Sequence, residues 1–279
     1  MADNGPVRIR YAVGSDPGLH RQENEDSVYT SSRLLAVADG MGGHVHGEIA
    51  SSAAITAMAA LDESLGSADP DPAAEQAGSG PEDNESVPDI DPRAALSGGV
   101  ADAGRRLDEL VGRDPSLQGM GTTLTAMLWI GDRFTLAHIG DSRAYLLRTD
   151  ELQQLTTDHT FVQALVDEGR MLPEQAAEHP RRSMLTRALQ GGSSAEPDVT
   201  LHDAWPGDRY LLCSDGLTDV VSFDELRGAL CARTDPDVVV RELINLANRG
   251  GGPDNISCVV VDVEAIQEGA VQGGTTAAE

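Results

Sequence analysis

Acidic residues of this chain recur where apolar strands are expected to begin or end. Asp39 follows the apolar run 34–38 and precedes a loop, 40–43, in which three of four residues are glycine. Such a run indicates a buried strand, and glycine lets the backbone approach a ligand closely. The Asp39 carboxylate and the Gly40 carbonyl could therefore face one point, and oxygen ligands of this kind suit Mg²⁺ or Mn²⁺. Taken alone, Asp-Gly after a strand is more often an ordinary turn.

The recurrence of this pattern changes that interpretation. Further acids stand beside expected strands at Asp215 after 210–214, Asp141 after 136–139, Asp254 before 256–263, and Glu25 and Asp26 before 27–30. Strand ends and their loops are where a rigid sheet can gather side chains from distant parts of a chain. Carboxylates gathered in this way repel one another unless cations neutralise them. The pattern predicts a multinuclear metal centre.

Six short motifs occur in a fixed order between about residue 8 and residue 263. They are Arg21-x-x-Asn24-Glu25-Asp26, Val37-Ala38-Asp39-Gly40-Met41-Gly42-Gly43, Gly121-Thr122-Thr123, Gly140-Asp141-Ser142-Arg143, Ser214-Asp215-Gly216-Leu217 and Pro253-Asp254-Asn255-Ile256. Each motif alone is weak, but the ordered set is specific. It resembles the metal-dependent serine/threonine protein phosphatases, the PPM or type 2C family, in its compact bacterial form.

This resemblance implies a fold and two metal ions. The expected fold is α+β, a four-layer α-β-β-α sandwich of two antiparallel sheets flanked by helices, with the metal centre at one end of the sheet interface. Asp39 would bridge two Mn²⁺ or Mg²⁺ ions. Asp215 and Asp254 would complete one ion, and the Gly40 carbonyl would serve the other.

The resemblance also implies further roles around the centre. Glu25 and Asp26 would act through ordered waters, and Asp141 with Asp215 would hold a weaker third ion. Arg21 would bind the substrate phosphate, because a planar guanidinium fork binds two oxygens at once. The expected catalytic set is thus Arg21, Glu25, Asp26 and Asp39.

The implied reaction is hydrolysis of phosphoserine and phosphothreonine in proteins by a metal-activated water, without a phosphoenzyme. Its partners would be phosphorylated proteins, and it would oppose bacterial serine/threonine kinases. Cys213 is followed by 214–219 without an arginine, so the loop of cysteine phosphatases is not present. In many eukaryotic relatives a histidine directly follows the metal-loop Asp-Gly. Here that position is Met41, and His44 follows three residues later, so the leaving-group proton could come from His44, a metal water or solvent.

Composition excludes several other classes of protein. The 279 residues carry a formal net charge of −26, which argues against nucleic acid and anionic lipid as partners. No apolar run approaches the ~18 residues that span a bilayer. The cysteines, Cys213, Cys231 and Cys258, have no short pair spacing, so we expect small buried side chains in a reducing cytoplasm. We expect a monomer.

The strands that carry the acids are spread along the whole chain and must converge, so we expect one domain over residues 7–263, which the resemblance implies is a phosphatase domain. Expected strands are 7–13, 27–30, 122–130, 133–139, 144–147, 198–204, 209–214 and 256–263, and expected helices are 46–65, 93–112 and 235–249. Gly131-Asp132 suggests a two-residue hairpin, and consecutive hairpins there predict an antiparallel meander. This pattern excludes a Rossmann fold.

Three segments depart from regular periodicity. Residues 66–92 contain eight acids and no basic residue, and we expect a disordered acidic insertion. It could be only a spacer, or a docking or autoinhibitory segment that competes for the metal site. The same family resemblance implies a flap at residues 157–189, which we expect to lie over the cleft and to shape substrate choice. His159 in this segment could contact substrate or could only begin a helix. Residues 264–279 are expected to be a frayed tail.

Two other functions stay open at this stage. One is a non-catalytic pseudophosphatase that binds phosphoproteins, although such modules usually lose metal ligands and this chain keeps Asp39, Asp141, Asp215 and Asp254. The other is a phosphatase for small phosphoesters or for one dedicated regulator.

Overall fold

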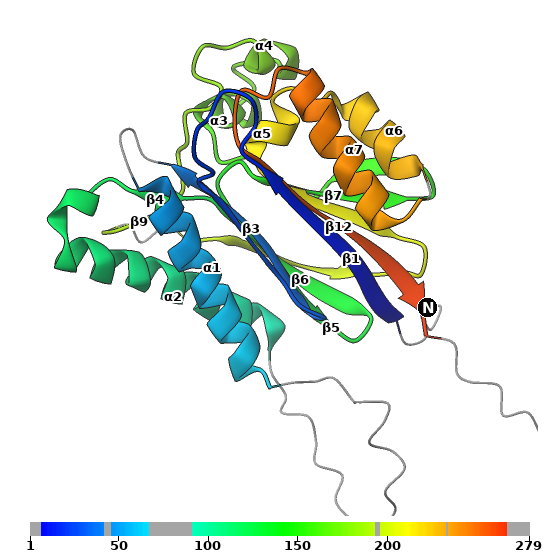
Figure 1. Ribbon diagram of the computed structural model, residues 1–279, viewed down its shortest axis with the longest axis horizontal. Coiled ribbons are helices and arrows are strands. Elements are labelled where there is room, and N and C mark those ends of the chain that lie inside the picture. Colours follow the sequence, from blue (N-terminus) through cyan, green and yellow to red (C-terminus); the bar gives the residue numbers. More distant parts are fainter. Residues whose placement is uncertain (1–6, 42–45, 67–90, 193–195, 233, 267–279) are drawn as a thin grey trace, which may run out of the picture.

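Two antiparallel sheets pack face to face, and helices cover both outer faces (Figure 1). The computed structural model describes residues 7–41, 46–66, 91–192, 196–232 and 234–266. Helices α1 (Gly47–Ser64) and α2 (Pro92–Arg113) lie outside one sheet, and α6 (Phe223–Cys231) and α7 (Pro236–Arg249) lie outside the other. The expected α-β-β-α sandwich is confirmed.

The first sheet brings the two ends of the chain together. Its order is β1 (Val7–Asp16), β12 (Ile256–Ala265), β11 (Arg209–Cys213), β7 (Arg143–Arg148) and β8 (Glu151–Gln154). Along β1 and β12, Val7 lies opposite Ala265 and Asp16 lies opposite Ile256. This register places Asp254, just before β12, beside the turn that follows β1.

The second sheet carries the Asp39 strand at its centre. Its order is β10 (Asp198–Asp203), β6 (Arg133–Ile139), β5 (Leu124–Ile130), β3 (Leu34–Met41), β4 (Gly121–Thr122) and β9 (Leu189–Gln190), with β2 (Asp26–Thr30) paired to β3. Asp26 is opposite Asp39 in this pairing. Two of the predicted site carboxylates are therefore neighbours across a ladder.

Strand β3 is buried on both faces, which explains its continuous apolar run. Leu34, Ala36 and Ala38 pack in the core beneath α1 and α2. Leu35 and Val37 pack in the core between the two sheets. A strand held on both faces gives Asp39 a rigid base.

The remaining helical segments are short. They are the 3₁₀ turn Pro115–Leu117 and α3 (Phe161–Asp167), α4 (Pro173–Ala177) and α5 (Asp215–Thr218). Helices α3, α4 and α5 gather at the top of the view in Figure 1. The helical expectation for the flap region is confirmed, whereas its effect on substrate choice stays a prediction.

The predicted meander is wrong beyond its first hairpin. Strands β5 and β6 pair antiparallel around Gly131-Asp132, as expected. Strand β7 then leaves this sheet and pairs with β11 and β8 in the other one. The crossing occurs at Gly140, whose φ of 114° is a conformation that side chains rarely allow. The prediction took sequential strands as neighbours and missed this switch.

Two boundaries also differ from the sequence expectation. Strand β12 continues through Glu264 and Ala265, because β1 offers partners for both and Arg8 Nε donates to Glu264 at 2.9 Å. The expected tail therefore cannot begin at 264. Helix α6 was not expected, although Ser222 and Glu225 form a capping box at its start. The expectations for the acidic insertion at 67–90 and for the tail at 267–279 fall outside the described residues.

Within the described residues, no helix is long and apolar enough to cross a bilayer. All three cysteines are free, with Cys213 and Cys258 buried as expected and Cys231 only partly so.

Candidate metal centre

Asp39 is held rigidly through its backbone. Its N–H donates to Thr123 Oγ1 at 3.0 Å, and its carbonyl oxygen accepts from Thr122 Oγ1 at 2.9 Å. A side chain at Gly40 would collide with the carbonyl oxygens of Glu25 and Gly47. The Asp-Gly step is therefore fixed by close packing, and the Gly40 position requires glycine.

Asn255 joins the segment before β2 to the loop before β12. Its Oδ1 accepts from the Glu25 N–H at 2.9 Å, and its Nδ2 donates to the carbonyl oxygens of Pro17 and Glu23 at 3.0 and 2.9 Å. Because Asp254 is the preceding residue, this amide aligns Glu25 and Asp254 on the same side of the cleft.

Asp26 lies beneath the cleft with one unsatisfied oxygen. The residue is 9% exposed. Ser214 Oγ donates to Oδ2 at 2.8 Å, and the buried Oδ1 has no hydrogen-bond partner among the described groups. Burial raises the pKa of Asp26 to about 6, despite the Ser214 bond. An orphaned carboxylate oxygen of this kind calls for a water or a cation.

Asp141 and Asp215 approach Asp39 from two different elements. Asp141 lies in the crossing between β6 and β7 and is buried, whereas Asp215 begins α5 directly after β11. Burial, and then the charge of Asp158, raises the pKa of Asp141 to about 7.

The carboxylates act on one another electrically. Burial, and then the charges of Asp215, Asp26 and Asp141, raises the pKa of Asp39 well above its ordinary value. Burial, and then the charge of Asp141, does the same to Asp215. These raised pKa values mean that the carboxylates repel one another when all of them are ionised and no cation is bound.

The predicted site residues share one cleft of about 580 Å³. It is lined by Arg21, Glu25, Asp39, Gly40, Met41, Thr123, Asp141, Ser183, Leu185, Gln190, Asp215 and Asp254. All of the predicted catalytic and metal residues line it except Asp26, which is buried below. These lining residues come from both sheets and from the end of the flap region.

Arg21 is paired with an acid in this structure. Its side chain is 48% exposed, and Nη2 lies 2.7 Å from Asp254 Oδ2. Glu25 is at 4.0 Å. Arg21 therefore sits at the cleft with its fork turned toward a candidate ligand, and its expected phosphate contact stays a prediction.

The donor set fits hard divalent cations that keep much of their water. Within the described ranges, no group of three or more His, Cys, Asp or Glu side chains lies close enough together to hold a metal ion by itself. The carboxylates nevertheless shift one another's pKa, one buried oxygen is orphaned, and no basic side chain neutralises Asp39 or Asp215 in the described part of the chain. Mg²⁺ and similar ions take a few carboxylates and several waters rather than an all-protein cage.

The general-acid candidate His44 and the possible substrate residue His159 have different outcomes. His44 lies outside the described residues, and Met41 lines the cleft. His159 is 4% exposed, with both ring nitrogens engaged, so it does not face the cleft as a substrate residue.

Several positioning residues were present in the motifs but received no role from sequence. Asn255 aligns two loops, Thr123 holds the Asp39 backbone, and Ser214 satisfies half of Asp26. Their signal was their place beside an acid in each motif. Asp219 had no such signal, yet its charge adds to the raised pKa of Asp215.

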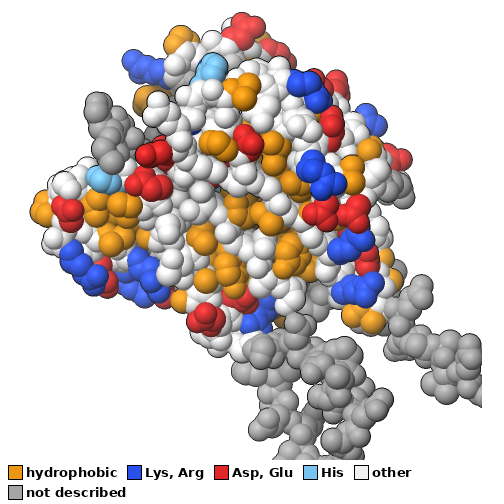
Figure 2. Space-filling model, viewed as in Figure 1, with side chains coloured by type: hydrophobic (Ala, Val, Ile, Leu, Met, Phe, Trp, Pro, Cys, Tyr) orange, Lys and Arg blue, Asp and Glu red, His pale blue; other side chains and the backbone are white. Residues whose placement is uncertain are grey.

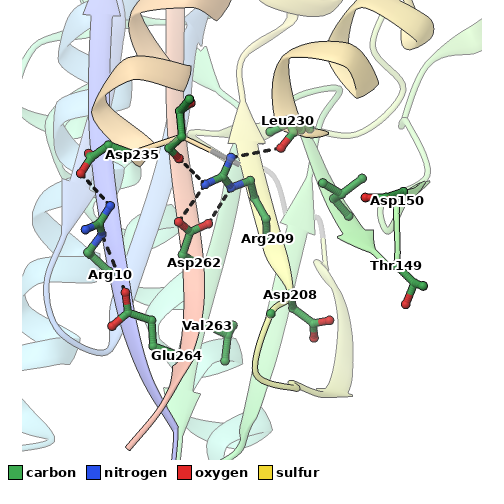
Figure 3. A pocket seen from close by; sticks show the side chains of 13 residues that line it. Arg10, Thr149, Asp150, Asp208, Arg209, Leu230, Asp235, Asp262, Val263 and Glu264 are labelled. Atoms are coloured by element: carbon green, nitrogen blue, oxygen red, sulfur yellow. Dashed lines mark hydrogen bonds and ion pairs between the residues drawn. The ribbon is translucent and has the colours of Figure 1, made fainter. Parts of the chain in front are cut away.

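A second cavity, of about 310 Å³, lies near the ends of β1, β11 and β12 that are farther from the carboxylate cluster (Figure 3). Arg209 is 7% exposed there, and it donates to Asp262 at 2.6 and 2.8 Å and to the carbonyl oxygen of Leu230 at 3.0 Å. Arg10 reaches Asp235 at 2.7 Å. Its charges are paired with one another, so we interpret this cavity as structural.

Comparisons with known proteins agree with this geometry. A family model described as "Protein phosphatase 2C" matches residues 17–246. The serine/threonine protein phosphatase PstP of Mycobacterium tuberculosis is 49% identical over 266 residues, which cover 95% of this chain. Protein phosphatase PhpP of Streptococcus pneumoniae is 32% identical over 89% of this chain and 95% of its own length.

A solved structure adds the metal. The solved structure of the catalytic domain of PstP in complex with two manganese ions is 46% identical to this chain and matches it with a TM-score of 0.77. The match covers 92% of this chain and 99% of the PstP chain. The chain spans about half the length, 47%, of the full-length PstP that it matches.

Proposed function

The chain belongs to the protein phosphatase 2C, or PPM, family, and on that premise we propose that it hydrolyses phosphoserine and phosphothreonine in proteins. The observation that carries the proposal is the cleft in which Asp39, Asp215 and Asp254 meet beside Arg21. A phosphomonoester is anionic, and the only arginine that lines this cleft among the described residues is Arg21. Substrate affinity would therefore depend on bound cations.

Asp39, Asp215, Asp254 and the Gly40 carbonyl would hold two Mn²⁺ or Mg²⁺ ions, and Asp141 with Asp215 would hold a weaker third. When bound, the ions supply Lewis-acid activation of water and of the phosphoryl oxygens.

The chain's own residues would orient the reaction. Arg21 would exchange part of its contact with Asp254 for two phosphate oxygens once cations neutralise that carboxylate. Glu25 lines the cleft and would accept hydrogen bonds from ordered water there. Asp26, buried under Asp39, would fix the water network from below rather than touch substrate.

The flap region would select among phosphoproteins. Ser183 and Leu185, on its returning segment, line the same cleft as Asp39. Arg182 lies 3.3 Å from Asp219, near the carboxylate cluster, and its side chain is 50% exposed. An exposed arginine at this edge would favour substrates with acidic side chains next to the phosphorylated residue.

We further propose that the protein acts as a monomer in the cytoplasm and opposes serine/threonine kinases. Its free cysteines fit a reducing compartment.

The test is Mn²⁺-dependent phosphate release from a phosphothreonine peptide, with EDTA as a control. Wild type should be active only with metal, and Asp39→Asn and Asp215→Asn should each lose at least ~100-fold in rate. Asp262→Asn, at the structural cavity, is the matched control and should keep its kcat. A folded wild type that binds Mn²⁺ without hydrolysing any phosphopeptide would favour a phosphoprotein-binding module.

A further inference from the structure

We propose that His159 is a positioning residue that holds the Asp141 loop and joins it to the base of the flap. The inference rests on the proposed metal-dependent function. His159 precedes α3 and is 4% exposed. Its position in the fold is far more constrained than that of a residue which only begins a helix.

Four hydrogen bonds fix His159 between two segments. The Gly140 N–H donates to its Nδ1 at 3.1 Å, and its own backbone N–H donates to the Gly140 carbonyl oxygen at 2.8 Å. Its Nε2 lies 3.0 Å from Asp198 Oδ2. Its carbonyl oxygen accepts from the Thr186 N–H at 2.8 Å. Because Nδ1 accepts, the neutral ring carries its proton on Nε2, toward Asp198.

The bonds to Gly140 control the direction of Asp141. Gly140 adopts a φ of 114°, and a Cβ there would press against Thr123. On the other side of Asp141, Ser142 Oγ lies 2.7 Å from Thr123 Oγ1. The Asp141 carboxylate is therefore aimed by a short loop whose first residue is bonded at both N–H and C=O to one histidine.

The same histidine lies at the neck of the flap, which is the place where the two ends of the flap segment pair. Thr160 and Leu185 form an isolated antiparallel bridge, and the Phe161 N–H donates to the Met184 carbonyl oxygen at 2.8 Å. Arg187, just after the neck, binds Asp198 at 2.9 Å and contacts the His159 ring. The neck that carries the flap is thereby attached to the loop that carries Asp141.

A second set of hydrogen bonds joins the Asp141 loop to the start of the flap. Arg143, two residues after Asp141, donates to both oxygens of Asp158, at 2.9 Å from Nε and 2.6 Å from Nη2. Asp158 is the residue before His159. Cation occupancy at Asp141 and the orientation of the flap should therefore influence each other, because neither segment can move far alone.

Two substitutions separate positioning from simple filling of space. In His159→Asn, the amide oxygen falls near the place of Nδ1 and can still accept from Gly140. In His159→Gln, the amide reaches the place of Nε2 and can still bind Asp198, but it leaves the Gly140 N–H without its acceptor. Gln is the closer match in size. A purely structural role would therefore be served at least as well by Gln as by Asn.

The experiment is calorimetric titration of the metal-free full chain with Mn²⁺, together with kcat and KM on a phosphothreonine peptide. We expect His159→Ala and His159→Gln to weaken the lowest-affinity Mn²⁺ site at least ~10-fold and to lower kcat, with the tighter sites unchanged. His159→Asn should stay within ~3-fold of wild type. His202→Gln, a histidine on β10 that bonds Thr200 and stacks on Phe134, is the matched control.

Equal Mn²⁺ affinity in all variants, or rescue by Gln but not by Asn, would overturn the inference. If the variants do not fold, hydrogen exchange on wild type decides. Protection of the Gly140 and Thr186 amides should then rise over the same range of Mn²⁺ concentration, and separate ranges would contradict the coupling. A wild type that binds no Mn²⁺ would instead remove the proposed function, and this inference with it.

Discussion

Asp26 and Asp62 are buried carboxylates of nearly equal exposure, 9% and 7%. Their pKa values are shifted in opposite directions. Burial alone would raise the pKa of both. At Asp62, hydrogen bonds from Arg33 at 2.5 Å and Tyr29 at 2.8 Å bring the pKa below its ordinary value. At Asp26 the hydrogen bond from Ser214 does not offset burial, and the pKa rises to about 6.

The same difference separates two regions of the molecule. Away from the cleft, Arg209 pairs with Asp262 and Arg148 pairs with Asp208. Figure 2 shows further arginines beside acids on the side that carries β1 and α7, where Arg10 pairs with Asp235 and Arg249 with Glu242. At the floor of the cleft, no basic side chain among the described residues forms an ion pair with Asp39 or Asp215. In a chain with 46 acids and 20 basic residues, the buried acids Asp62 and Asp208 thus have arginine partners, whereas the candidate ligands Asp39 and Asp215 have none among the described residues.

The largest expected change comes from breaking a compensated pair. Asp62→Asn leaves Arg33 with its side chain only 18% exposed and without a counter-charge. We expect a loss of about 3 kcal/mol in the free energy of unfolding, measured by urea denaturation. Phosphatase activity of the folded fraction should be unchanged. A stability equal to wild type would show that this acid is not structural.

The reverse result is expected at the cleft. Asp39→Asn should lose at least ~100-fold in phosphatase rate, which is ~2.7 kcal/mol, yet the metal-free protein should be no less stable than wild type, because a repelled charge is removed. Thermal unfolding in EDTA measures this. A large loss of metal-free stability would mean that the carboxylate serves the fold.

The metal-free protein should become less stable as pH rises from about 4 to about 7. The folded pKa values of Asp26, about 6, and Asp141, about 7, lie above the ordinary 3.8. The folded state therefore binds more protons than the unfolded state in this window, and its stability falls as pH rises. Asp62 acts oppositely, because its lowered pKa gives stability that is lost only below its ordinary range.

Melting temperatures in EDTA between pH 5 and pH 8 check this prediction. Asp26→Asn should flatten the slope, and saturating Mn²⁺ should remove it. A melting temperature in EDTA that rises over this interval would contradict the assignment.

The smallest effect is expected at Arg21, which stands between the two regions because it lines the cleft and yet pairs with Asp254. Arg21→Ala should raise KM for a phosphopeptide about 10-fold, or ~1.4 kcal/mol, with a smaller change in kcat. Arg8→Ala, at an exposed pair with Glu264, is the control and should leave KM unaltered.

Sequence predicted the parts of this fold that local pattern controls. The apolar run 34–38, the helix expected at 46–65 and the Gly131-Asp132 hairpin each carry their own signal, and each is confirmed. Convergence of the acids could be predicted because strand-end carboxylates recur in motifs of known order.

Other features depend on contacts between distant residues and had no local signal. The sheet switch at Gly140 depends on packing against Thr123. The burial of Asp26 arises from its pairing across to β3 and from Ser214, 188 residues away. The four bonds of His159 likewise join segments that sequence spacing does not relate.

The central claim is that Asp39 and Asp215 have no basic partner among the described residues because they bind metal. The most direct measurement is calorimetric titration of metal-free protein with Mn²⁺ at pH 6 and pH 8, in two buffers of different ionisation enthalpy, so that released protons are counted. The account predicts tight binding with net proton release at pH 6, much less release at pH 8, and loss of tight binding in Asp39→Asn but not in Asp62→Asn. Failure to bind Mn²⁺ at millimolar concentration, or equal binding by Asp39→Asn, would contradict it.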